Sequence, residues 1–430
     1  MFSRFKTKRA AYPVYLFSEF TLSLLFSMMF VVDSVYQVNV VGLNALQLVL
    51  VGTTLEVSAF VCEVPTGVIA DVYSRRLSII IGMFVMGLGF VIEGAFPFFA
   101  PILLAQVIWG LGYTFTSGAT QAWIADEVGE EQAGKAFLRA SQIGTVGALI
   151  GIGAGTLIGT LGVNLPIVLG GALLMVLGLV LIIIMPETGF EPTPREDRNT
   201  FQSMAHTFKS GLRVVRGKPA LINILTIGLI LGLYSEGYDR LWAAHLLENI
   251  TLPTIGNLQP VVWFGLIRAA GMLLGLGVTE FVQRRVDTAR HGPVARAVLL
   301  LITGMVAGLL TFALTGSFII AVLALWGFSS LRQTVGPLYT AWVNQHAESS
   351  VRATVISMSS QIDALGQILG GPIVGVIGLA LGIPVSLTIC AVVLATVLPL
   401  LIRTIKIDRQ TEVTANEVVV DEVAVHKLLP

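Results

Sequence analysis

The residues of this sequence that could do chemistry are ionisable side chains set inside long apolar runs. Four of them fall near the middle of such runs, namely Glu56, Arg268, Arg332 and Asp363. A charged group is costly to place in an apolar medium, so each is a candidate functional residue. The carboxylates can exchange protons or cations, while each arginine can either act on a substrate or pair with one of the acids as a buried structural contact.

A second set lies nearer the ends of the apolar runs, where contact with water or lipid headgroups is the simpler interpretation. Its members are Asp33, Glu93, Glu236, Asp239 and Arg240 toward the outer ends, and Glu19 and Glu63 toward the inner ends. Acids outnumber arginines inside the runs, and a surplus of carboxylates in a low dielectric favours proton exchange. The balance predicts proton coupling and, more weakly, a cationic substrate. It disfavours organic anions and phosphates, which call for a concentrated basic site.

Polar side chains could complete a cavity around these charges. Glu56 and Glu63 lie two helical turns apart on one face, which suits a path of carboxylates toward the inner side. The full candidate set for proton coupling and the substrate cavity is Asp33, Glu56, Glu63, Gln106, Tyr113, Glu236, Arg268, Arg332 and Asp363. Further aromatic and amide residues, equally suited to helix contacts, are Tyr36, Gln37, Gln121, Tyr234 and Tyr238.

Motifs of enzymes and metal sites are missing from the sequence. It contains no GxxxxGK[ST] phosphate loop, no HExxH and no GxSxG, and its histidines are scattered. The two cysteines, Cys62 and Cys390, fall in apolar runs without metal-type spacing. Formal net charge is zero, which gives no reason to expect nucleic acid. We therefore expect no enzyme, no cofactor and no metal.

The elements that hold these side chains must be membrane helices. The chain is 55% hydrophobic and 12% charged, whereas soluble domains are about 25% charged. Runs long enough to cross a bilayer as helices are predicted at 12–37, 46–70, 77–97, 100–124, 136–160, 166–185, 219–246, 258–282, 294–315, 318–343, 352–379 and 384–404. The first run follows several basic residues but has no cleavage site after it, so we interpret it as an uncleaved span.

The placement of lysine and arginine predicts the direction of the spans. Apart from Arg240, Arg268 and Arg332, the basic residues lie in or beside the termini and the even-numbered connections. The odd-numbered connections carry none. Cytoplasmic loops are rich in lysine and arginine, so both termini are predicted to be cytoplasmic in a multi-pass protein of the cell membrane.

The longest polar interruption divides the spans six from six. The predicted parts are a six-helix bundle at 1–185, a central cytoplasmic loop at 186–218, a second six-helix bundle at 219–404 and a cytoplasmic tail at 405–430. Within the loop, 201–215 could form an amphipathic helix on the inner leaflet or serve as a plain linker.

The two halves repeat each other. AWIADE at Ala122 recurs as AWVNQH at Ala341, and SQI at Ser141 recurs with the same spacing at Ser360. The turn Asp71-x-x-x-Arg75-Arg76 has a counterpart in Glu280-x-x-x-Arg284-Arg285. Each copy follows the second span of its half, so the sequence predicts a duplicated six-helix unit.

Together with the stretch GVIADVYSRR, these features resemble the major facilitator superfamily. Its motif at this turn is roughly G-x-x-x-D-[RK]-x-G-R-[RK]. Gly67, Asp71, Arg75 and Arg76 match, while Val72 and Ser74 replace the usual basic residue and glycine. The preceding EVPTG looks like bacterial drug-efflux members. The resemblance implies an all-α integral membrane fold of two pseudo-symmetric six-helix bundles, alternating access, a small-molecule substrate and a monomer in the lipid bilayer.

Two positions depart from the drug–proton exchangers of that superfamily. Gln106 stands where they usually carry an arginine before Gly-x-Gly, and GIGAGTLIG (residues 151–159) lacks the usual Gly-Pro. The resemblance and the surplus of acids still make export of amphipathic or drug-like compounds in exchange for protons the leading function. The alternatives are a facilitator or symporter of a nutrient, metabolite or lipid, and a non-transporting receptor or scaffold.

The resemblance also suggests a gating role for the acid of each repeated turn. In that architecture Asp71 lies beside the start of span eleven, near 349–352, and Glu280 beside the start of span five, near Lys135. A carboxylate at a helix N-terminus is stabilised by roughly 0.3–2 kcal/mol. Such contacts would latch the two halves together on the cytoplasmic side while leaving both states populated.

Asp71→Asn is therefore expected to favour the state open to the cytoplasm and to slow transport. Labelling of engineered cysteines from the cytoplasmic side measures the opening. Unchanged labelling in the variant would contradict the latch.

Overall fold

Twelve helices long and apolar enough to cross a membrane occur in the part of the chain that the structure describes. The structure is a computed structural model that describes residues 2–192, 219–254, 256, 258–287, 291–346 and 352–406. All twelve predicted spans are confirmed, with ends within about four residues of those expected. The exception is the fifth span, which begins at Glu130 rather than at 136. The central connection from 193 to 218 and the tail from 407 lie outside the described residues.

The helices of the first half are α1 (Phe2–Val35), its π-helical extension η1 (Tyr36–Val40), α2 (Ala45–Val72), α3 (Arg75–Ala95), α4 (Phe99–Thr116), α5 (Ala119–Val128), α6 (Glu130–Gly159) and α7 (Leu165–Ile184). Together α4 and α5 form the fourth span. They are separated at Gly118, whose φ of 73° is the left-handed conformation that favours glycine.

The helices of the second half are α9 (Pro219–Glu248), α10 (Pro260–Arg285), α11 (His291–Leu314), α12 (Phe318–His346), α13 (Arg352–Leu381) and α14 (Ile383–Ala395). The membrane-crossing stretch that contains α14 continues to Lys406. Every regular element in the described part of the chain is a helix.

Equivalent glycines pack the two halves in the same way. A Cβ built on Gly147 of α6 would stand 2.5 Å from the Phe20 carbonyl oxygen of α1. Its repeat partner Gly366 of α13 would stand 2.5 Å from the Leu229 oxygen of α9. The absence of a side chain lets the backbones of the paired helices touch, which is how membrane helices associate closely. The predicted duplication is therefore visible as shared helix packing.

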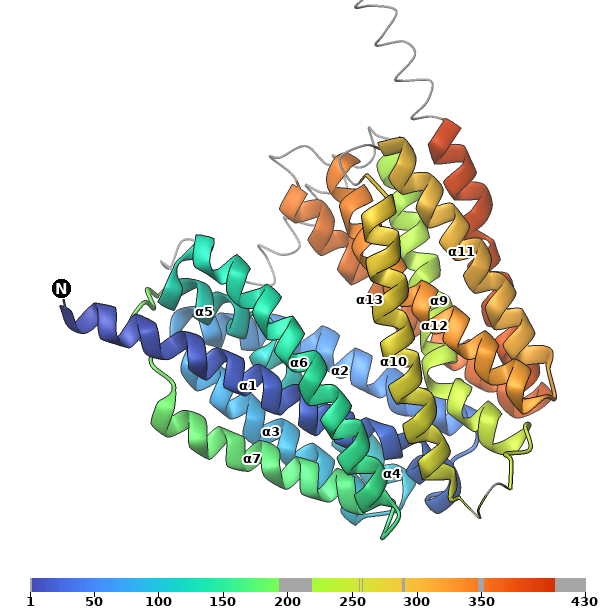
Figure 1. The fold of residues 1–430 in the computed structure, drawn as a ribbon, viewed down its shortest axis with the longest axis horizontal. Helices are drawn as coiled ribbons and strands as arrows, with labels where there is room; N and C mark the ends of the chain where they lie inside the picture. The colour runs from blue at the N-terminus through green and yellow to red at the C-terminus, as the bar shows by residue number, and fades with distance from the viewer. Residues whose placement is uncertain are drawn as a thin grey trace, which may run out of the picture.

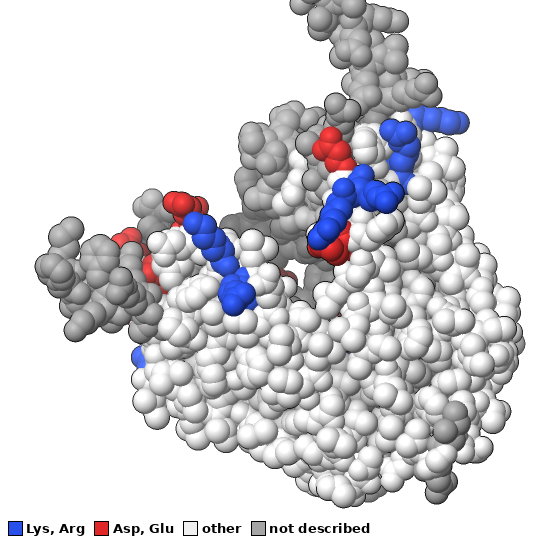
Figure 2. Space-filling view, in the orientation of Figure 1, with Lys and Arg blue, Asp and Glu red and all other residues white. Residues whose placement is uncertain are grey.

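The halves meet on one side of the membrane and separate on the other. Figure 1 shows them diverging toward the side where α1 begins, which we call the terminal face. On the opposite face α2 lies against α13, where a Cβ at Gly375 would be 3.2 Å from the Val49 side chain. There α6 also meets α10, and Gln259 Nε2 donates to the Thr160 carbonyl at 3.4 Å. Figure 2 shows the resulting hollow, with charged side chains gathered along both rims at the terminal face.

The contact between α1 and α6 is expected to be sensitive to a single methyl group. Gly151→Ala would drive its Cβ into the Leu24 carbonyl, whereas Gly153→Ala, on the same helix, meets nothing within 4 Å. Overpacking costs about 1–3 kcal/mol, so Gly151→Ala should lower the midpoint of thermal unfolding in detergent while Gly153→Ala leaves it near that of the wild type. Equal midpoints for the two variants would show that this packing is wrong.

Candidate functional site

The charged turn between α2 and α3 is tied to its own half. Ser74 caps α3 by accepting from the Leu77 backbone N–H at 2.9 Å. Arg75 forms an ion pair with Asp126 at the end of α5. The Arg76 backbone N–H donates to Glu187 Oε1, 2.8 Å away in the segment that follows α7. The two arginines therefore fasten the turn to neighbouring helix ends as well as adding positive charge.

The acids of the two repeated turns lie where the halves are apart. Asp71 has no hydrogen bond or ion pair to any residue that the structure describes, and 347–351 lie outside the described residues. Glu280 accepts from Arg284 of its own helix at 2.7 Å, and Arg285 lies 4.8 Å over the Phe281 ring. A Cβ at Gly67 would meet nothing within 4 Å. The latch between the halves stays a prediction for the state closed at this face.

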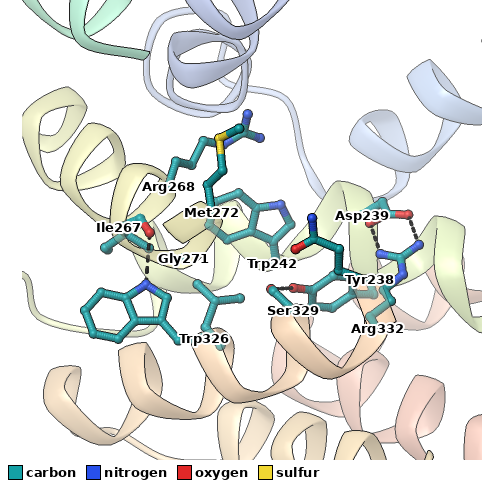
Figure 3. Close-up of a pocket in the computed structure, with 12 residues that line it drawn as sticks. Tyr238, Asp239, Trp242, Ile267, Arg268, Gly271, Met272, Trp326, Ser329 and Arg332 are labelled. Atoms are coloured by element: carbon teal, nitrogen blue, oxygen red, sulfur yellow. Dashed lines mark hydrogen bonds and ion pairs between the residues drawn. The ribbon is translucent and has the colours of Figure 1, made fainter. Parts of the chain in front are cut away.

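A cavity of about 550 Å³ lies among α9, α10 and α12 and is a candidate binding space. Its aromatic lining includes Tyr238, Trp242 and Trp326 (Figure 3). The Trp326 indole N–H donates to the Ile267 carbonyl at 2.9 Å, and the Tyr238 hydroxyl lies 3.3 Å from Ser329 Oγ. These contacts fix the orientation of the rings, so the cavity offers a preformed surface for a flat apolar group.

Two predicted arginines line this cavity in different states. Arg332 forms a two-pronged ion pair with Asp239, one arm measuring 2.7 Å, and lies 5.4 Å from the centre of the Tyr238 ring. Arg268 lies 5.6 Å over the Trp242 ring and has no hydrogen bond or ion pair to any described residue. The interpretation that an arginine pairs with an acid as a structural contact therefore holds for Arg332, although its partner is Asp239 rather than Glu56 or Asp363. That interpretation does not hold for Arg268.

A groove of about 320 Å³ lies between the halves. Glu56, Glu63 and Tyr113 from the first half line it opposite Ser360 and Gln361 of α13. These three predicted residues are therefore brought to one space that touches both bundles.

Asp363 lines an adjoining cavity of about 320 Å³ in the second half. Its carboxylate accepts from Gln367 Nε2 at 2.8 Å. Ser360 borders both this cavity and the groove that holds Glu56. The sequence assigns both acids to one substrate cavity, whereas they line two neighbouring spaces that share Ser360.

Two carboxylates, the half-buried Asp33 and the buried Glu93, form a polar cluster in the first half. Gln37 Nε2 donates to Asp33 Oδ1 at 3.1 Å and to Glu93 Oε1 at 2.9 Å. Gln106 Nε2 donates to Glu93 Oε2 at 3.1 Å. Gln106 thus contacts an acid from the position where the resembling exchangers carry an arginine. The cluster joins α1, η1, α3 and α4 through neutral donors only.

The expectation that acids near the outer ends contact water or headgroups is wrong for Glu93 and Glu236, each 2% exposed. Polar residues from separate helices enclose Glu93. Glu236 bonds to Arg240 one turn later on α9 at 3.0 Å. A Cβ at Gly52 of α2 would overlap both side chains, so this pair lies against the first half. Contacts between helices, rather than depth along the helix, decide the burial of these acids.

Several residues of the site are missing from the set that the sequence predicts for proton coupling and the substrate cavity. Glu93 is the only acid of α3, which could have marked it as a site residue. Its position near the end of the helix indicated contact with water or headgroups instead. Trp242 follows Tyr238 by one helical turn, so the two share a face of α9. Asp239 pairs with Arg332 of α12, and Trp326 bonds to Ile267 of α10. Contacts between distant helices cannot be recognised in a single sequence.

Comparison with known proteins agrees with this architecture. A family model described as Major Facilitator Superfamily matches residues 11–360. The chain is 26% identical over 364 residues to the uncharacterized MFS-type transporter YxaM of Bacillus subtilis (strain 168), covering 84% of this chain and 87% of that one. It is 22% identical to Multidrug resistance protein 2 of the same organism, covering 71% and 74%.

Among solved structures, the nucleoside transporter NupG aligns with a TM-score of 0.72 at 14% identity, covering 92% of this chain and 99% of that one. A bacterial homologue of the human lysosomal transporter Spinster, in an inward-facing and unoccupied conformation, aligns at 0.68 and 16% identity, covering 94% and 97%. At such identities the likeness shows the fold alone. The chain belongs to the major facilitator superfamily. It is a multi-pass membrane transporter of that type rather than an enzyme.

Proposed function

We propose that the protein is a proton-coupled secondary transporter that moves amphipathic small molecules by alternating access, exporting them in exchange for protons. The observation that carries the proposal is the one-sided closure of the two bundles, in contact at the opposite face and separated by a hollow at the terminal face. With the termini in the cytoplasm, as the basic residues predict, this state is open inward.

The site of proton coupling in this proposal is the Asp33–Glu93 cluster. Two carboxylates share the Gln37 amide, and the cluster has no direct ion pair with a described residue. Neutral donors do not cancel a negative charge, and an uncompensated charge is costly in an apolar interior. Binding one proton removes one of the two negative charges and so lowers this cost. Arg240 and Arg268 of the second half act electrostatically on Asp33, which makes that charge sensitive to how the halves sit.

The transported compound occupies the aromatic cavity of the second half and the groove between the halves. A cavity of about 550 Å³ falls within the range of about 300–1,000 Å³ for sites of drug-sized ligands. The distant relative named as a multidrug resistance protein is consistent with an amphipathic compound. Glu56 and Glu63, in the groove, would then line the proton path toward the terminal face.

A second candidate, symport of an organic metabolite with protons, is favoured by the unpaired Arg268 in the cavity. Exchange and symport differ in the direction in which substrate moves protons. Purified protein in liposomes that contain a pH-sensitive dye distinguishes them for any one compound.

Removal of the Asp33 or Glu93 carboxylate is expected to uncouple transport from the pH gradient. In liposomes with an imposed gradient, Asp33→Asn and Glu93→Gln should each abolish gradient-driven accumulation of an amphipathic probe, because the amide cannot take up the proton. Glu56→Gln and Asp363→Asn report whether Glu56 of the groove and Asp363 of the adjoining cavity share this role. The matched control is Glu191→Gln, whose side chain is exposed. Wild-type flux that ignores the gradient, or full coupling in both Asp33→Asn and Glu93→Gln, would contradict the proposal.

A further inference from the structure

One positive charge inside the second half lacks a partner. Arg268 of α10 has no hydrogen bond or ion pair within the described part of the chain. Arg268 is half-buried, and its guanidinium nitrogens are not among the fully buried polar atoms that lack a partner. The residue lines the 550 Å³ cavity, where Figure 3 shows its side chain among the other lining residues.

The acids of the second half near Arg268 are already paired with other arginines. Asp239 is bonded to Arg332 and Glu236 to Arg240. Asp33 of the first half accepts from Gln37 and acts on Arg268 only through longer-range electrostatics. The Trp242 ring beside the guanidinium attracts it but carries no charge that could neutralise it. An unpaired guanidinium within a transmembrane bundle is costly, and a bound anion would remove that cost.

The other residues that line the cavity indicate what kind of apolar group such an anion should carry. Tyr238, Trp242 and Trp326 supply aromatic surface, and the hydrogen bonds of Tyr238 and Trp326 hold their rings in place. A guanidinium binds a carboxylate through two parallel hydrogen bonds, which fixes the orientation of the ligand as well as its charge.

We propose that the cavity binds an aromatic or similarly flat organic carboxylate, with the carboxylate on Arg268 and the apolar body among Tyr238, Trp242 and Trp326. The proposal rests on the transport function above and names its substrate class. It replaces the cationic substrate that the surplus of acids predicts, because most acids nearest the cavity are paired and the free charge facing it is positive.

The test compares two probes of the same shape and different charge, 1-naphthylacetate and 1-naphthaleneacetamide, by isothermal titration calorimetry on the full chain in nanodiscs. Wild-type protein should bind the carboxylate at least about tenfold more tightly than the amide, the factor that corresponds to about 1.4 kcal/mol. Equal affinity for the two probes, tighter binding of the amide, or no binding of the carboxylate would overturn the proposal without involving any variant.

Substitutions then locate the interaction. Arg268→Gln should abolish the preference for the carboxylate, and Arg268→Lys should retain part of it because the charge remains without the two-pronged geometry. The matched control is Arg296→Gln on the exposed side of α11, whose guanidinium bonds to the Gly292 carbonyl at 3.1 Å. A preference that survives in Arg268→Gln would place the anion elsewhere and overturn the assignment.

The two proposals can fail separately. Calorimetry reports binding of a carboxylate at equilibrium, whereas the liposome experiment reports coupling between flux and the pH gradient. If the wild type prefers the carboxylate but its flux is independent of the gradient, the proposed substrate class is supported and proton coupling is contradicted. If an amphipathic probe shows gradient-driven flux but the carboxylate is not preferred, proton coupling is supported and the proposed substrate class is contradicted.

Discussion

The high cost of an unbalanced charge in the interior of a membrane protein is the constraint on which the site depends. The fold meets this constraint in three different ways. Asp239 and Glu236 are paired with arginines, and the Asp33–Glu93 pair is held by neutral amides. Arg268 is left facing a cavity. Each arrangement points to a different role, namely structural support, proton binding and substrate binding.

Close helix contacts at glycines place these charges. In each half the first and fifth spans touch backbone to backbone, at Gly147 and Gly366, so both bundles behave as similar rigid units. Between the halves, Gly52, Gly371 and Gly375 allow α2 to approach α9 and α13 at the opposite face. Because that contact is confined to one face, rotation of one bundle against the other can exchange which face is open.

The sequence predicts the fold almost completely, because each span is a long apolar run and the repeat of Asp71-x-x-x-Arg75 in Glu280-x-x-x-Arg284 marks the two halves. Candidate site residues could be recognised as charges in apolar runs, because the cost of placing a charge in an apolar medium depends only on the local sequence. Their partners could not, because the contact of Asp239 with Arg332 depends on helix rotation and on distant sequence. A count of acids against arginines therefore weakly predicts a cationic substrate. The way in which those charges pair in the structure favours an anionic substrate instead.

The most direct test of alternating access about the opposite-face contact is a pair of distance measurements by pulsed electron resonance between spin labels. One pair, at Leu138 and Phe281, spans the halves at the terminal face, and the other, at Leu161 and Leu314, spans them at the opposite face; all four side chains are exposed. In vesicles with and without a pH gradient, the account predicts that the first distance shortens as the second lengthens. Two distances that stay fixed, or that change in the same direction, would contradict it.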